Sequence, residues 1–241
     1  MTTRFDVFLS YSTRDAATAE RVREALGAAG VSVWWDREGI RELDHIPDAL
    51  REAVADARVT LVLASQHQAT SWICRWEMLT SILDGAARGQ DRVLLLALDD
   101  SLKNMSSAAR TRRALLPDRD GTFGDTALSV RAFIDALPAA GGISQRGVGT
   151  LHGLPGTAGA RFVGRTDALL SVFDALLSPF QSPDSGTVHG PAVCVVSGMG
   201  GIGKTSMALF VAEQIGPARS LGALWLRASG DAVDNSVSDA T

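Results

Sequence analysis

The sequence predicts an α/β protein with two parts: a flavodoxin-like domain with a parallel sheet, then a linker and the beginning of a second α/β domain. Three observations predict this fold class. Apolar runs of strand length alternate with helical patterns through residues 1–137, and this alternation is typical of βαβ units with right-handed crossovers. A stretch rich in Gly, Ala and Pro follows at 138–160. A Gly-rich motif then stands between a strand-like run and a helical pattern within 192–216.

The first part contains four expected strands and four expected helices. The runs "RVTLVLAS" and "RVLLLALDD" are almost continuously apolar, as in a parallel sheet that is covered on both faces. Gly30 follows one helical pattern and favours a helix end there, while Pro47 suits the first turn of another helix. We expect strands over 5–12, 31–36, 58–65 and 92–100, and helices over 15–30, 46–57, 71–89 and 126–137.

The remaining chain divides into a linker and a second domain. Residues 138–160 have no apolar period, which is typical of a flexible linker. Residues 161–241 are then expected to form the N-terminal part of a domain with a phosphate-binding loop (P-loop). In it we expect a helix within 161–177, a strand over 192–198, a helix over 205–216 and a strand over 223–228.

Composition narrows the class of protein. The net charge of −4 over 241 residues gives no reason to expect nucleic acid or an anionic membrane as a partner. No apolar run approaches the roughly 20 residues that span a bilayer, and the N-terminus is not that of a signal peptide. The two cysteines, Cys74 and Cys194, lie far apart in apolar contexts, which favours free thiols in a reducing compartment. We therefore expect a cytoplasmic protein.

The Gly-rich motif predicts a nucleotide site. Gly198, Gly203, Lys204 and Thr205 fit the pattern G-x-x-x-x-G-K-[ST] between a strand and a helix. In such a loop the lysine reaches the outer phosphates and the Thr205 hydroxyl holds Mg²⁺, so Thr205 is also the predicted metal ligand. The backbone N–H groups and the helix N-terminus complete the phosphate site. The other expected contacts come from Gly200, Gly201 and Ser206.

The fuller string "SGMGGIGKTSMAL" resembles the P-loop of the STAND ATPases, the NB-ARC and NOD-like nucleotide switches. Upstream, "FVGR" resembles the entry motif of that family, which implies that Arg165 lies near the nucleotide, although Thr166 stands where the family usually has an acidic residue. No acidic Walker B strand follows. We therefore expect no ATP hydrolysis by this chain alone, ATP or ADP with Mg²⁺ in a longer parent protein, and a C-terminal sensor domain absent from this sequence.

Four blocks of the first part, in order, resemble the TIR domain: "FDVFLSYSTRD", "GVSVWWDREGI", "IPDALREAVADARVTLVLAS" and "SWICRWEM". Some TIR domains only assemble with one another, through a loop in which Leu43 here replaces a frequent Gly. Others cleave NAD⁺ at the nicotinamide–ribose bond, with a catalytic Glu three residues after a Cys. Glu77 holds that place after Cys74.

The resemblance implies that NAD⁺ is the substrate and binds at the carboxyl ends of the strands, where open α/β sheets bind ligands. Single Trp residues pack more often than they bind a ligand, and Arg14 also suits the start of the first helix. The expected NAD⁺ contacts are Ser10, Tyr11, Ser12, Arg14, Trp34, Asp36 and Trp76.

Together the two resemblances predict a TIR–STAND effector in signalling or antiphage defence. It would hydrolyse NAD⁺, self-associate through its TIR domain and be activated by nucleotide-controlled oligomerisation. The alternative is a non-enzymatic adaptor that acts only by TIR–TIR binding. The sequence pattern at Glu77 favours the enzyme.

Overall fold

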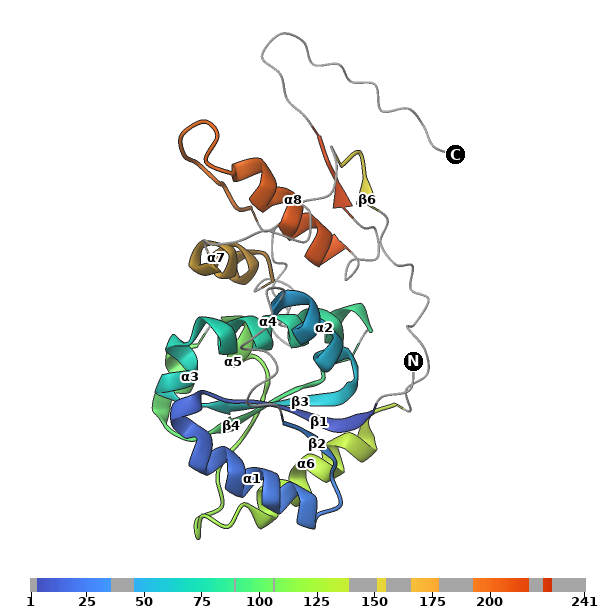
Figure 1. The fold of residues 1–241 in the computed structure, drawn as a ribbon, viewed down its shortest axis with the longest axis vertical. Helices are drawn as coiled ribbons and strands as arrows, with labels where there is room; N and C mark the ends of the chain where they lie inside the picture. The colour runs from blue at the N-terminus through green and yellow to red at the C-terminus, as the bar shows by residue number, and fades with distance from the viewer. Residues whose placement is uncertain are drawn as a thin grey trace, which may run out of the picture.

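The structure is a computed structural model, and it describes residues 4–35, 46–88, 90–105, 107–138, 151–154, 166–177, 193–216 and 223–226. Its centre is a parallel five-stranded sheet with the strand order β2-β1-β3-β4-β5 (Figure 1). The strands are β1 Phe5–Ser10, β2 Val33–Trp34, β3 Ala57–Ala64, β4 Val93–Ala97 and β5 Arg113–Leu115. This is the flavodoxin-like α/β fold that the sequence predicts.

Helices cover both faces of this sheet. One face carries α1 (Ala16–Ala28) and α6 (Gly124–Ala136), and the other carries α2 (Ile46–Ala55) and α4 (Trp72–Ala87) (Figure 1). Short elements complete the domain at the ends of the strands: η1 Thr13–Asp15, α3 Gln66–Thr70, η2 Asp100–Asn104 and α5 Ser107–Arg110. None of the helices in the described ranges is long and apolar enough to cross a membrane.

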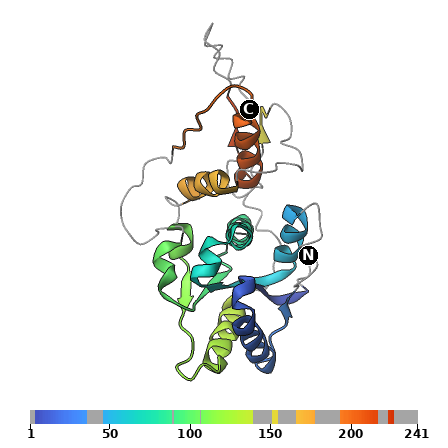
Figure 2. The same cartoon turned by 60° about the vertical axis from the view of Figure 1, so that its left-hand side comes forward.

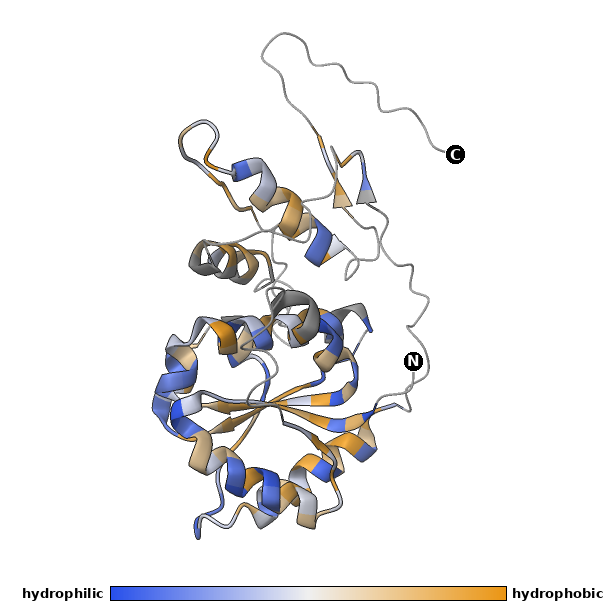
Figure 3. Cartoon of the chain, in the orientation of Figure 1, coloured by the Kyte–Doolittle hydropathy of each residue, from blue (hydrophilic) through white to orange (hydrophobic). Residues whose placement is uncertain are grey.

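The strands bury apolar side chains on both sides because successive residues of a strand point to opposite faces. Val7 and Leu9 of β1 pack with α1 and α6, whereas Phe8 packs with α2 and α4. Seven of the eight residues of β3 are buried, and Arg58 is half-buried. In Figure 3 the strands are orange over much of their length, with blue at a few polar positions, and the helices beside them carry blue and orange patches. Ser10, two residues after Phe8, therefore points toward the α2 and α4 side.

Element boundaries differ from the expectation in specific places. The helix expected over 46–57 ends at Ala55, and Ala57 already pairs with Phe5 as the first residue of β3. The edge strand β5 and the helix α3 were not expected, because "RAL" is short and polar at its start and "QHQAT" has no apolar face.

The described residues of the second part of the chain include two helices. These are α7 (Thr166–Leu177) and α8 (Lys204–Ile215), as expected from the sequence. Two short strands, β6 (Leu151–His152) and β7 (Ala223–Leu224), pair with each other in parallel. Thus β6 forms within the stretch expected to be a linker.

The strand expected over 192–198 is a wrong prediction for the residues that are described. The backbone from 193 to 199 is irregular, and Val193 and Val195 are 79% and 84% exposed. A strand needs a neighbour to bond its N–H and C=O groups, and β7, the nearest strand in sequence, pairs with β6 instead.

Figures 1 and 2 both show α7 and α8 on the α4 side of the sheet, opposite α1 and α6. Leu169 and Phe173 of α7 and Met207 and Phe210 of α8 belong to the same buried cluster as Trp76 of α4. The two parts of the chain thus share one hydrophobic core.

Candidate functional site

Glu77 lies in the second turn of α4, and a short polar chain fixes that turn over the sheet. The hydroxyl of Thr60 in β3 donates to Ser81 Oγ at 2.8 Å, and Ser81 Oγ donates to the main-chain oxygen of Glu77 at 2.8 Å. Ser81 and Thr60 are 2% and 3% exposed. The first bond joins β3 to α4 and the second lies within α4, so the buried Thr60–Ser81 bond fixes the position of α4 on β3.

The Glu77 side chain points to the end of β1. Ser10 Oγ donates to Glu77 Oε2 at 2.5 Å, and the two side chains are 1% and 9% exposed. The resemblance to TIR domains predicts that Ser10 and Glu77 belong to one site, and the structure brings the two side chains into contact. It also gives Ser10 a second role: its hydroxyl donates its hydrogen to the Glu77 carboxylate.

Burial dominates the electrostatics of this carboxyl group. Desolvation raises the pKa of Glu77 to about 7, and the hydrogen bond from Ser10 opposes that rise. No cation among the described residues pairs with Glu77. The protein therefore keeps an uncompensated carboxyl group in an apolar place, an arrangement that is costly for the fold and common at functional sites.

Cys74 lies one turn before Glu77 and is not a nucleophile at neutral pH. Burial, and secondly the negative charge of Glu77, raise the pKa of the Cys74 thiol to about 12. Only a thiolate attacks or binds a metal readily, so of these two neighbouring groups Glu77 is the one that ionises near neutral pH.

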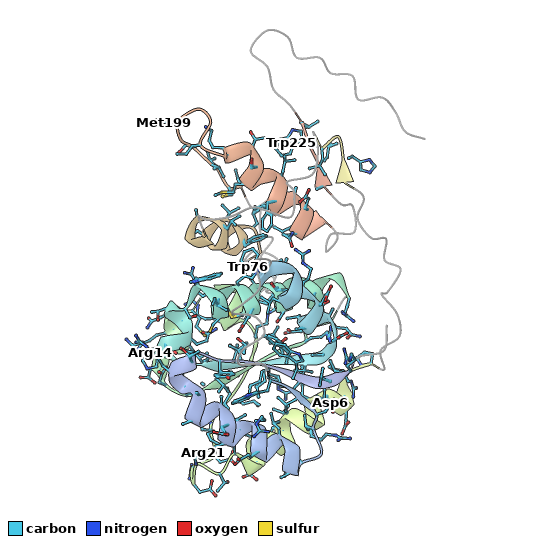
Figure 4. The ribbon with its side chains drawn as sticks, viewed as in Figure 1. Asp6, Arg14, Arg21, Trp76, Met199 and Trp225 are labelled. Carbon is cyan, nitrogen blue, oxygen red and sulfur yellow. The ribbon has the colours of Figure 1, made fainter. Side chains whose placement is uncertain are left out.

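The other polar groups gather where the strands end. Ser12 follows β1 and accepts from the Arg14 N–H at 3.4 Å. Asp15 accepts from Ser65 Oγ, which joins the end of β1 to the end of β3. Arg14 itself is exposed at this edge, opposite Asp6 at the start of β1 (Figure 4).

The aromatic residues predicted to contact NAD⁺ are separated by the sheet. Trp34 stacks on Phe8 at 5.0 Å, on the same face as Glu77. Tyr11 stacks on Trp35 at 4.9 Å against the opposite cluster. Trp76 is 8% exposed and its ring contacts α7 and α8, so the structure does not bring it to the carboxylate. Asp36 lies outside the described residues.

The Gly-rich segment predicted to be a P-loop curls around Lys204. Lys204 is the first residue of α8, and its Nζ donates to the main-chain oxygens of Gly198 at 2.8 Å and Met199 at 2.7 Å. Gly203 has φ +91° and Gly201 has φ +73°, a backbone that favours glycine. Thr205 and Ser206 are exposed in the first turn of α8. Arg165 lies outside the described residues.

Two features of the edge were missed by sequence reasoning. Ser65 caps α3 by accepting from the Gln68 N–H at 3.0 Å, and Asp99 accepts from the Gln66 N–H at 3.0 Å and the Ser101 N–H at 2.8 Å. The spacing of Ser65 and Gln68 is that of a capping box and is the signal that predicts α3. Within the described ranges, no group of His, Cys, Asp and Glu is arranged to hold a metal ion.

A sequence model of the family described as "TIR domain" matches residues 7–122. Among solved structures, the chain is similar to a metazoan TIR-STING receptor from C. gigas in complex with 2′,3′-cGAMP. The identity is 15%, the TM-score is 0.42, and the match covers 53% of this chain and 39% of that chain. The present chain thus spans about two fifths of the length of that receptor. Comparison with curated proteins found no match. The match of the family model and the five-stranded parallel sheet support the same conclusion: residues 7–122 form a TIR domain.

Proposed function

We propose that the TIR domain cleaves NAD⁺ at the nicotinamide–ribose bond, with Glu77 as the catalytic carboxylate. One observation carries this proposal: a buried carboxyl group, held by Ser10 at the carboxyl end of β1, faces no cation among the described residues. A fixed anion in such a place stabilises positive charge that develops on a substrate.

The chemistry needs only one carboxylate. In NAD⁺ the nicotinamide nitrogen is already cationic, so the C–N bond breaks with its electron pair moving to that nitrogen, and nicotinamide leaves as a neutral molecule. Most glycoside hydrolases need a second carboxyl group to protonate the leaving group, and here that step is unnecessary. Glu77 stabilises the oxocarbenium-like ribose, water adds to the anomeric carbon, and one proton is released.

Other groups at the strand ends support binding of the substrate. Arg14 is exposed there and suits the pyrophosphate. Trp34 lies on the face of the sheet that carries Glu77 and presents an aromatic surface to a ring. Ser12 is the N-cap of η1. Ser10 and Ser12 both stand at the end of β1, beside the proposed substrate site.

The activity is expected to rise with pH through the region of 7, because the proposed role needs the ionised carboxylate and burial raises the pKa of Glu77 to about 7. The hydrogen bond from Ser10 lowers that pKa, so Ser10→Ala should move the midpoint of the pH–rate profile upward, and Ser10→Thr should restore it. Initial rates of nicotinamide release between pH 5 and 9 measure this. An unchanged midpoint in Ser10→Ala would mean that the hydroxyl does not act on the carboxylate.

We further propose that the sites work in assemblies of TIR domains, as the resemblance implies for the segment from Asp36 to His45, which lies outside the described residues. Specific activity should then rise with protein concentration, and fusion of the full chain to a multimerising scaffold should raise it at low concentration. Release of nicotinamide from NAD⁺ by both forms, across a concentration series, tests the function. Equal activity per molecule would mean that the monomer site is complete. No release in either form would favour the adaptor function.

For the second part of the chain we propose a nucleotide site of the STAND type for ADP or ATP with Mg²⁺. Its support is the placement of Lys204 at the N-terminus of α8, with its ammonium group inside the loop that ends at Gly203. Residues 193–198 are irregular, so we expect weak affinity in this chain. Thr205 follows in the first turn and would hold the metal ion.

A further inference from the structure

The contact between α4 and the helices α7 and α8 is built from aromatic rings. Trp76 stacks on Phe210 of α8, with ring centroids 5.9 Å apart and an interplanar angle of 28°. It meets Phe173 of α7 edge-on at 6.3 Å. These three side chains are 8%, 8% and 0% exposed. A ring cluster of this kind is worth more than its buried area alone, because its geometry is specific.

Aliphatic and polar groups extend the same contact. Leu169, Met207 and Val211 are between 3% and 7% exposed within this cluster. Beside them, Arg51 of α2 donates through Nη2 to Gln214 Oε1 of α8 at 2.7 Å. The α2 and α4 face of the TIR domain is therefore covered by a fitted partner from the same chain.

The contact lies between the two proposed sites. Trp76 directly precedes Glu77 in α4, and Phe210 stands in the helix that begins with Lys204. At a rise of 1.5 Å per residue, Phe210 is about 9 Å along α8 from the P-loop lysine. Figure 4 shows Trp76 between the two parts and Met199 at the far end of α8.

A ligand in the P-loop acts directly on the start of α8. Lys204 Nζ is bonded to the main-chain oxygens of Gly198 and Met199. An ammonium group has three N–H donors, so the third can meet a phosphate. The negative charge of that phosphate then competes with the two carbonyl oxygens for Lys204 and attracts the N-terminus of α8. Because a helix moves largely as a unit and packed cores transmit displacement, such a change reaches Phe210.

We propose that the α7–α8 pair docks on the α4 face of the TIR domain as an intramolecular partner, and that the Phe210–Trp76 contact transmits the state of the P-loop to Glu77. This inference rests on the proposed roles of Glu77 and Lys204. The docked α7–α8 pair keeps the first turns of α4 in position. Nucleotide bound at the P-loop shifts α8 and so weakens its contact with α4. Phe210 and Trp76 are positioning residues in this device and touch neither ligand.

Hydrogen exchange of the full chain, measured peptide by peptide, tests the docking surface. Phe210→Ala should speed amide exchange in α4 by at least about tenfold, because it removes a buried ring from the cover of that helix. Phe210→Leu keeps apolar volume and should have a smaller effect. Trp72→Ala is the matched control, since its ring stands on the same helix but is 45% exposed, and it should leave α4 unchanged.

The strand β3 serves as the internal reference for global unfolding. If Phe210→Ala also raises amide exchange in β3, the whole domain has been destabilised. Exchange in α4 is then compared between the unmodified protein and Phe210→Leu. Unchanged exchange of α4 in both variants, with β3 intact, would overturn the docking surface.

Millimolar ADP with Mg²⁺ tests the transmission in the same measurement. It should protect the segment 198–206 and alter exchange in α4, and Phe210→Leu should weaken only the second effect. Lys204→Ala should remove both. Protection of the loop with no change in α4 would overturn the coupling while the nucleotide site stands. No protection of the loop would overturn the nucleotide site and with it the coupling, whereas the docking surface is judged by the Phe210 variants alone.

Discussion

Glu77→Gln is expected to lower kcat/KM for NAD⁺ cleavage by about 10²–10³-fold, the usual effect of removing one main electrostatic stabiliser of a transition state. Glutamine has nearly the shape of glutamate, and its amide oxygen accepts the hydrogen bond from Ser10 that Oε2 accepts now. The fold and the packing of α4 are therefore retained, and only the negative charge is lost. Nicotinamide release under single-turnover conditions measures the chemical step directly.

The matched control is Glu52→Gln, which removes a carboxylate from an exposed position in α2. It should leave turnover unchanged. Full activity in a folded Glu77→Gln protein would remove Glu77 from the mechanism, whatever the behaviour of Ser10. A loss of activity in both variants would point to a general effect of charge on the protein.

Much of the fold could be predicted from the sequence because its signals are local. Near-continuous apolar runs identify β3 and β4, since a strand buried on both faces has no polar side. Gly30 marks the end of α1 and has φ +73° in the structure. The edge strand β5 escaped prediction because an edge strand is short and carries polar residues such as Arg113.

The segment before the Gly-rich motif shows the limit of local signals. "AVCVVSG" has the composition of a buried strand, yet Val195 is 84% exposed and its backbone is irregular. Strand formation depends on a neighbouring strand, which composition alone does not supply. Conversely, the helix expected after the loop forms, with Lys204 as its first residue, and Gly201 and Gly203 have positive φ, because a helix start and a glycine backbone are local properties.

For the candidate site, sequence reasoning placed Ser10 and Glu77 together through the resemblance to TIR domains, and the contact between them is visible only in the fold, since they are 67 residues apart. Trp76 shows the opposite case. Its neighbour Glu77 points to β1, whereas the Trp76 ring packs on α7 and α8. Adjacent residues of a helix point about 100° apart, so its position next to Glu77 in the sequence does not bring the Trp76 ring to the Glu77 carboxylate.

The same carboxylate should make the stability of the protein depend on pH. Burial raises the pKa of Glu77 from the model-peptide value of 4.5 to about 7. Between these values the unfolded chain has lost the proton that the folded chain keeps, so the free energy of unfolding falls as the pH rises. The fall is fully developed above pH 7 and absent below pH 4.5. A shift of this size corresponds to about 3 kcal/mol, an upper bound for this group.

Glu77→Gln removes this titration and should therefore stabilise the fold at pH 8 by up to about 3 kcal/mol relative to its effect at pH 4. The new amide N–H group needs an acceptor, but that cost is the same at both pH values and cancels in the comparison. Urea unfolding followed by tryptophan fluorescence at pH 4, 6 and 8 gives the required differences. Parallel pH profiles for the two proteins would show that the carboxyl group of Glu77 ionises in the folded protein as readily as in the unfolded chain. A variant that is inactive yet more stable above pH 7 would instead show that the fold tolerates a destabilising charge at the position where the proposed reaction needs one.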